Sequence, residues 1–227
     1  MTSRTVAPFA AIAWLALASV IPFGASAQDR SFESRVDRPM LELVAPVLAA
    51  AERDSLPVEA LRAKVLEGAT KNRPPQLVAQ VVGRLADDFR TTRAELRQHI
   101  PNASIAAEEL VAAAFARQQN VPVESMADLW TARTSGQRLE IPLTVMAELV
   151  RRGVLAADAA ALMRHVLSSG IPLERAALIP GRFDGLANPG VAPPEALERA
   201  LRDLDIPSPP RSPGAPAPRP LPGVIGD

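Results

Sequence analysis

The chain has 227 residues, in which 25 basic side chains balance 25 acidic ones, with no cysteine and no tyrosine. Charge balance argues against a nucleic-acid binder, which needs a basic surface to displace counterions from phosphate, and against a polybasic membrane-surface module. The lack of cysteine excludes a disulfide framework and thiolate metal sites, and the scarcity of aromatic residues disfavours stacked clefts for sugars or single-stranded nucleic acids.

The first segment is predicted to be a secretory signal peptide over residues 1–27. Arg4 supplies a short basic region, an apolar run extends from Val6 to Phe23, and small residues at Ala25 and Ala27 form an A-x-A cleavage site. This run is shorter than the roughly 20 residues that span a bilayer, although an uncleaved anchor is the alternative. We therefore expect an exported protein, periplasmic or secreted, that meets the membrane only transiently through its signal peptide.

The rest of the chain is predicted to be all-α. Ala, Leu, Arg and Glu dominate between prolines, and no stretch alternates β-branched residues with a period of two. The clearest amphipathic helices are expected over about 76–98, 103–118 and 155–168, with Leu77, Phe89, Leu110 and Leu155 among the side chains predicted to be buried. Shorter helices are expected near 40–53, 58–68, 122–133, 142–152, 172–178 and 194–204.

One junction recurs along the chain. It has the form aliphatic–Pro–aliphatic–Glu and occurs at residues 56–59, 121–124 and 171–174. Proline suits the first helical position, where its missing N–H has no partner, and the glutamate then lies at the positive end of the helix dipole. The recurrence predicts an array of degenerate helical-hairpin repeats over residues 37–205, either an α-solenoid or a compact helical bundle.

Two segments are expected to lie outside this array. Residues 206–227 are dense in Pro, Ala, Gly and Ser, which predicts a disordered, partly polyproline-II tail. Such a tail is either solvated or a ligand for a partner that has a groove. Residues 28–36 are expected to be a short linker.

The candidate binding site consists of Lys64, Glu67, Lys71 and Arg73. Lys64 and Glu67 share a helix face at i, i+3 spacing, and Gly68 is expected to cap the helix, so that Lys71 and Arg73 lie past its end. One interpretation is a small anion-binding or carboxylate-binding corner. The alternative is a charged pair with basic residues that complement the negative end of the helix.

No catalytic, metal or cofactor site is predicted elsewhere. His99 and His165 belong to different helices without carboxylates placed to complete a ligand set. Glu108 and Glu109 are expected to be solvated, because adjacent side chains on a helix point about 100° apart. Trp130 is expected to lie in the core rather than to form a ligand platform.

A pattern of Pro…Leu-x-x-Lys-Val-x-Glu-Gly-x-x-Lys…Pro covers residues 57–74. Its residues are Pro57, Leu61, Lys64, Val65, Glu67, Gly68, Lys71 and Pro74. In this pattern the chain resembles a group of exported bacterial helical proteins without known activity, over about residues 56–96. The resemblance implies export and a helical fold, and it transfers no catalytic residue. Trp130 and Arg133 stand where Val65 and Gly68 would align in the next repeat.

These observations together predict an exported, non-enzymatic helical-repeat protein that acts as an interaction or scaffold protein of the bacterial cell envelope. Its expected partner is another protein or an envelope component. The alternative is an all-α cell-wall hydrolase or lyase with a single Glu as general acid. A structural or stress-protective protein without a specific ligand is a third possibility.

Overall fold

The computed structural model describes residues 32–187 and 190–210, and in these ranges the chain is all-helical. The predicted fold class is thereby confirmed. The predicted signal peptide and residues 211–227 of the predicted tail lie outside the described residues. No helix in the described ranges is both long and apolar enough to cross a membrane.

The helices range from 4 to 25 residues in length and follow one another with short connections. In chain order they are α2 (Arg38–Arg53), α3 (Val58–Thr70), α4 (Pro75–His99), α5 (Ala107–Gln118), α6 (Val123–Ala132), α7 (Glu140–Arg151), α8 (Ala156–Ser168), α9 (Leu173–Ala176), α10 (Ile179–Leu186) and α11 (Pro193–Asp203). α10 has no counterpart among the predicted helices, because Pro180, Gly181 and Gly185 lower its intrinsic helix propensity.

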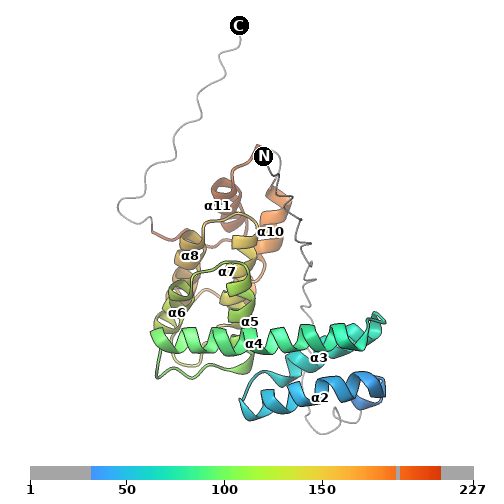
Figure 1. The fold of residues 1–227 in the computed structure, drawn as a ribbon. Helices are drawn as coiled ribbons and strands as arrows, with labels where there is room; N and C mark the ends of the chain where they lie inside the picture. Colours follow the sequence, from blue (N-terminus) through green and yellow to red (C-terminus); the bar gives the residue numbers. More distant parts are fainter. Residues whose placement is uncertain (1–31, 188–189, 211–227) are drawn as a thin grey trace, which may run out of the picture.

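Two hydrophobic cores meet along α4. The first core lies between α2, α3, α4 and one face of α5, and it contains fully buried side chains such as Leu61, Val82 and Phe89. The second core is formed by α5 to α11 together with Leu96 near the end of α4. Figure 1 shows α2 and α3 on one side of α4 and the remaining helices on the other side. The longest helix therefore connects the two packed regions.

The predicted buried stripes are confirmed only in part. Phe89 and Leu110 are buried as predicted, whereas Leu77 is 46% exposed and Leu155 is 68% exposed. In the first turns of α4 the buried face passes through Val78 instead of its neighbour Leu77. Leu155 is the extended N-cap residue of α8 and does not belong to its buried face.

The recurring proline junction forms the same backbone corner after α2, α5 and α8. The corner residues Ser55, Asn120 and Gly170 have positive φ angles of 51°, 63° and 66°. The N–H of the next residue then donates to the carbonyl five residues back, in the bonds Leu56–Ala51 (2.9 Å), Val121–Ala116 (3.1 Å) and Ile171–Val166 (3.3 Å). This geometry is the Schellman motif, in which a residue at positive φ ends a helix and its carbonyls are satisfied.

After each corner the chain enters the next helix as predicted, with one difference of position. Pro57, Pro122 and Pro172 are N-cap residues rather than the first helical residues, a shift of one position. The glutamates at positions 59, 124 and 174 lie in the first helical turn, where the helix dipole favours a carboxylate.

Several helices pack on the helix that lies two places further along the chain. α2 packs on α4, α5 packs on α7, and α6 packs on α8. α4 then contacts α5 and α6, and α7 contacts α8 and α9. α4 and α7 are therefore each packed against both helices that follow them in the chain.

The packed region extends beyond the predicted boundaries at both ends. Phe32 and Val36 are only 9% and 6% exposed, so the first core begins within the predicted linker 28–36. Ile206 is 4% exposed, and its N–H donates to the carbonyl of Leu201 (2.9 Å). The second core therefore includes the first residue of the predicted tail, because the helix-ending motif of α11 places that residue against the bundle.

Gly68 does not cap α3, and this prediction is wrong. The helix continues to Thr70, Lys71 is its C-cap, and Asn72 takes the positive φ of 50°. A Cβ atom at Gly68 would lie 2.5 Å from Cγ2 of Val78 on α4. Glycine is required here because the two helices approach each other closely, not because the chain turns.

Candidate functional site

The predicted site on α3 is a local charged cluster. Lys64 Nζ and Lys71 Nζ lie 2.7 and 2.6 Å from the two carboxylate oxygens of Glu67. Hydrogen bonds from Lys64 and Lys71 hold the pKa of Glu67 below its ordinary value. Arg73 lies past the helix end, where its backbone N–H donates to the carbonyl of Gly68 (2.9 Å). The geometry brings three of the four predicted residues together, and both ammonium groups face Glu67.

A cavity of about 410 Å³ opens at a different place, between the start of α5 and the loop that joins α6 to α7. Ser104 and Ala106 line it from the segment before α5, Glu109 from α5 itself, and Trp130 from α6. Residues 133–138 of the loop complete its wall. The residues of the α3 cluster do not line this cavity.

Glu109 is the buried carboxylate of this cavity, with a residue exposure of 3%. Its Oε1 accepts hydrogen bonds from Arg133 Nη1 (3.0 Å) and from the backbone N–H of Leu139 (3.2 Å). Its Oε2 accepts from the backbone N–H of Ala106 (3.1 Å), the N-cap residue of α5. The side chain therefore ties the start of α5 to both ends of the α6–α7 loop.

The prediction that Glu109 is solvated is wrong. Glu108 does follow the prediction, since its side chain is 62% exposed. Glu109 points the other way, and Arg133, which is 24 residues away in sequence, supplies the opposite charge that allows its burial. Nothing in the spacing of these residues could have indicated the pair.

Further polar groups surround the cavity. Arg138 lies between Glu108 and Glu140, with nitrogen–oxygen distances of 3.4 and 3.2 Å, and is 61% exposed. Trp130 belongs to the core as predicted, at 7% exposure. Its indole Nε1 has no hydrogen-bond partner among the described residues, which is costly for a buried donor. The charged side chains that line the cavity are therefore paired with carboxylates or arginines of the protein itself.

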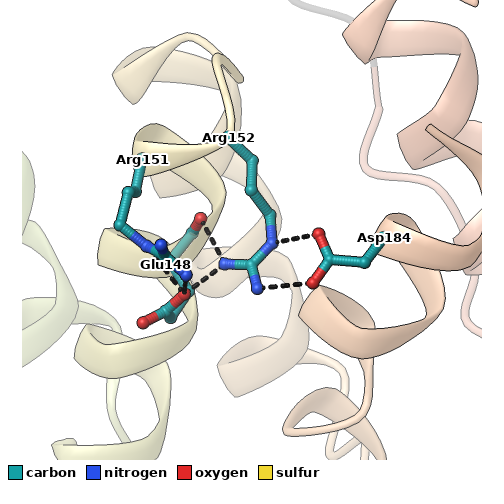
Figure 2. Close-up of polar contacts among 4 residues, drawn as sticks. All are labelled: Glu148, Arg151, Arg152 and Asp184. Carbon is teal, nitrogen blue, oxygen red and sulfur yellow. Dashed lines mark hydrogen bonds and ion pairs between the residues drawn. The ribbon is translucent and has the colours of Figure 1, made fainter. Parts of the chain in front are cut away.

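A second long-range cluster joins α7 to α10, as Figure 2 shows. Arg152 Nε and Nη2 bind the two carboxylate oxygens of Asp184 at 2.6 and 2.7 Å. Arg152 Nη1 also donates to the carbonyl of Glu148 (2.9 Å) and pairs with the Glu148 carboxylate, which Arg151 contacts at 2.6 Å. The bidentate pair adds a polar contact between α7 and α10, which is also held by the buried side chains of Ile179 and Phe183.

The charged groups in this cluster shift one another's pKa values. The hydrogen bond from Arg152 holds the pKa of Asp184 below its ordinary value, and Asp184 in turn raises the pKa of Arg152. Burial favours the protonated form of Glu148, but hydrogen bonds from Arg151 and Arg152 outweigh it, so the pKa of Glu148 is also lowered. Asp184, Glu148 and Arg152 are therefore charged at neutral pH.

The two histidines have contacts of their own. His99 Nε2 is 3.9 Å from a carboxylate oxygen of Glu124, and His165 Nδ1 is 3.2 Å from the hydroxyl of Ser169. Within residues 32–187 and 190–210, no group of three histidine, cysteine or acidic residues is placed to hold a metal ion.

Comparisons of the chain with models of protein families, with curated proteins and with solved structures find no match. The cavity at Glu109 and the cluster at Arg152 are two places where polar side chains distant in the sequence converge.

Proposed function

We propose that the chain is an exported, non-enzymatic helical-repeat protein that acts as an interaction or scaffold protein of the bacterial cell envelope. The observation that carries this proposal is the Schellman–proline corner after α2, α5 and α8, together with the recurring contacts of α4 and α7 with the helices that follow them. Units that stack on their neighbours create extended surfaces, and repeat proteins use such surfaces to bind partners.

The proposed export is supported by the sequence of residues 1–27, with its apolar run and its small residues at Ala25 and Ala27. The partner is proposed to be a protein or an envelope component and not a nucleic acid, because equal numbers of acidic and basic residues leave no excess positive charge. No cofactor is invoked.

A role as scaffold also agrees with how Glu109 is used. An all-α hydrolase of the alternative kind needs a glutamate that is available to exchange a proton with its substrate. Glu109 lines the cavity, yet Arg133 and two backbone N–H groups occupy its two oxygens. This arrangement supports a structural role for the carboxylate, which holds the α6–α7 loop to the start of α5.

Export can be tested by expressing the chain with its own first 27 residues in a Gram-negative host and measuring the mass of the protein in each cell fraction. We expect a periplasmic or secreted protein that begins at Gln28. A matched variant with Ala25→Asp and Ala27→Asp should keep its leader, because small residues are needed at the cleavage site. A wild-type chain that keeps Met1 and stays in the cytosol would contradict the proposal.

Binding can be tested by crosslinking the purified protein in an envelope extract. The full chain is compared with a variant that ends at Pro210, because ending it before the buried Ile206 would damage the second core. We expect both to capture the same component, and excess untagged protein to compete with that capture. A purified protein that captures nothing but turns over a defined envelope substrate would contradict a non-enzymatic role.

A further inference from the structure

We propose that the segment 221–225 of this chain docks on an open hollow between the start of α10 and the end of α11. The inference goes beyond the proposed function, because it assigns a contact within the molecule to a segment that is otherwise solvated or free to bind a partner. The segment itself lies beyond the described residues, whereas the hollow and the point where the chain leaves the bundle are both described.

The hollow is mainly apolar and has a volume of about 380 Å³. Ala177, Leu178 and Gly181 line it from the start of α10, and Leu204 lines it from the end of α11. Leu178 is 58% exposed, which leaves much of a large apolar side chain in water. An added Cβ atom at Gly181 would meet no atom within 4 Å, so this side of α10 is open. These residues offer a surface that aliphatic side chains can cover.

The charge around the hollow favours an aliphatic occupant over a charged one. Arg182 also lines the hollow, and its Nε donates to a carboxylate oxygen of Asp203 on α11 (2.8 Å). An anionic ligand would have to compete with this ion pair for the guanidinium group. An aliphatic side chain needs no polar partner and can cover Leu178 while the ion pair stays intact.

The chain beyond Pro210 supplies such side chains within reach. Residues 211–220 are Pro, Ala, Gly, Ser and Arg, and the aliphatic residues Leu221, Val224 and Ile225 follow them. The 11 residues from 211 to 221 can span up to about 36 Å. Leu204 stands six residues before Pro210 and therefore lies no more than about 22 Å from it. The segment can therefore return to the hollow.

The small size of the hollow favours a tethered occupant over a separate molecule. One or two aliphatic side chains on such a surface give a Kd of about 1 mM. A segment held by a short flexible linker has an effective concentration in the mM range, so contact of this strength is enough to keep it docked for about half of the time. A separate partner with the same side chains would need a comparable concentration to displace it.

Disulfide trapping tests the proposal directly, because the chain has no cysteine of its own. The full chain carries Gly181→Cys and Val224→Cys and is treated with oxidised glutathione at low protein concentration. Gly181 leaves room for the new side chain. We expect a disulfide within one chain, measured over time by mass spectrometry of unreduced peptides.

Two further substitutions in the same double-cysteine chain separate docking from random encounters. Leu178→Ser removes the exposed apolar side chain at the N-cap of α10, where serine is well tolerated, and Leu221→Ser changes the segment instead. A tenfold weaker contact lowers the docked share from about one half to about one tenth, so each should slow disulfide formation about fivefold. Circular dichroism confirms that each variant is folded. The inference is overturned if either variant forms the disulfide at the original rate, or if no disulfide forms within one chain.

Discussion

The charged cluster on α3 and the charged cluster beneath the cavity differ in how they are built. Glu67 pairs with lysines three and four residues away, and its side chain is 40% exposed. Glu109 pairs with Arg133 and Leu139, which are 24 and 30 residues away, and its side chain is 4% exposed. The first cluster therefore belongs to one helix, whereas the second holds separate elements together.

This difference decides how much each cluster contributes to stability. Ion pairs within an exposed helix contribute about 0.3–0.5 kcal/mol, because water screens the charges and two long side chains lose freedom. Removing one partner of a buried pair costs about 3–5 kcal/mol, since the other charge is left buried without compensation. The start of α5 and the α6–α7 loop should therefore depend on Glu109 far more than α3 depends on Glu67.

The largest effect is expected from Glu109→Ala. Loss of the carboxylate leaves Arg133 and two backbone N–H groups without their acceptor, and the free energy of unfolding should fall by about 3 kcal/mol. Urea unfolding followed by circular dichroism measures this change. The neighbouring Glu108→Ala is the matched control and should change stability by less than about 0.5 kcal/mol. An equal fall in the free energy of unfolding of the two variants would mean that Glu109 does not stabilise the loop.

The next effect is expected where α3 meets α4. Gly68→Ala would place a Cβ atom 2.5 Å from Val78, whose branched side chain is buried and cannot easily rotate. We expect a loss of about 1–2 kcal/mol from overpacking, against the usual gain from alanine in a helix. At Gly83 on α4 no atom lies within 4 Å of an added Cβ, so Gly83→Ala should stabilise the protein. A stabilising Gly68→Ala would show that the helices are not in close contact.

A smaller effect is expected from Asp184→Asn at the junction of α7 and α10. Because its pKa in the folded protein lies below the ordinary value of 3.8, the ionised side chain stabilises the fold above that pH. We expect a loss of about 1 kcal/mol at neutral pH, since the side chain is partly exposed. The difference from the wild type should shrink as the pH falls through the carboxyl range and the wild type becomes protonated. Unfolding curves between pH 7 and pH 3 that keep a constant difference would contradict the ion pair.

The smallest effect is expected from Glu67→Gln on α3. Its partners Lys64 and Lys71 lie on the same helix and stay in contact with solvent, so the free energy of unfolding should change by less than about 0.5 kcal/mol. A destabilisation as large as that of Glu109→Ala would remove the distinction between the two clusters.

Local sequence patterns predicted much of the fold. The helices and the corners follow from apolar spacing, from proline and from residues that tolerate positive φ, all of which act over a few residues. The same patterns misjudged Gly68 and Ile206, because a close helix contact and a packed helix end depend on segments that the local pattern does not contain. A glycine at the end of a helical pattern can therefore either cap the helix or allow close contact with a neighbouring helix. Only the packing of the folded chain distinguishes these two roles.

The sequence did not predict the cavity, because the residues that line it come from separate segments of the chain. Glu109 stands beside Glu108 in the sequence, and only the packing of α5 on α7 brings Arg133 and the backbone of Leu139 to it. The one hint was the excess of polar and small residues at 133–138, which marks a loop without indicating what the loop encloses. The α3 cluster was predictable because all its pairs are local.

The measurement that tests this account most directly is hydrogen–deuterium exchange of the wild-type chain, of Glu109→Ala and of Glu67→Gln. Because Glu109 holds the start of α5 to the α6–α7 loop, its loss should speed exchange in the segments 104–110 and 130–140, whereas Glu67→Gln should leave exchange in the segment 58–73 close to that of the wild type. Unchanged exchange at 104–110 and 130–140 in Glu109→Ala would contradict the account.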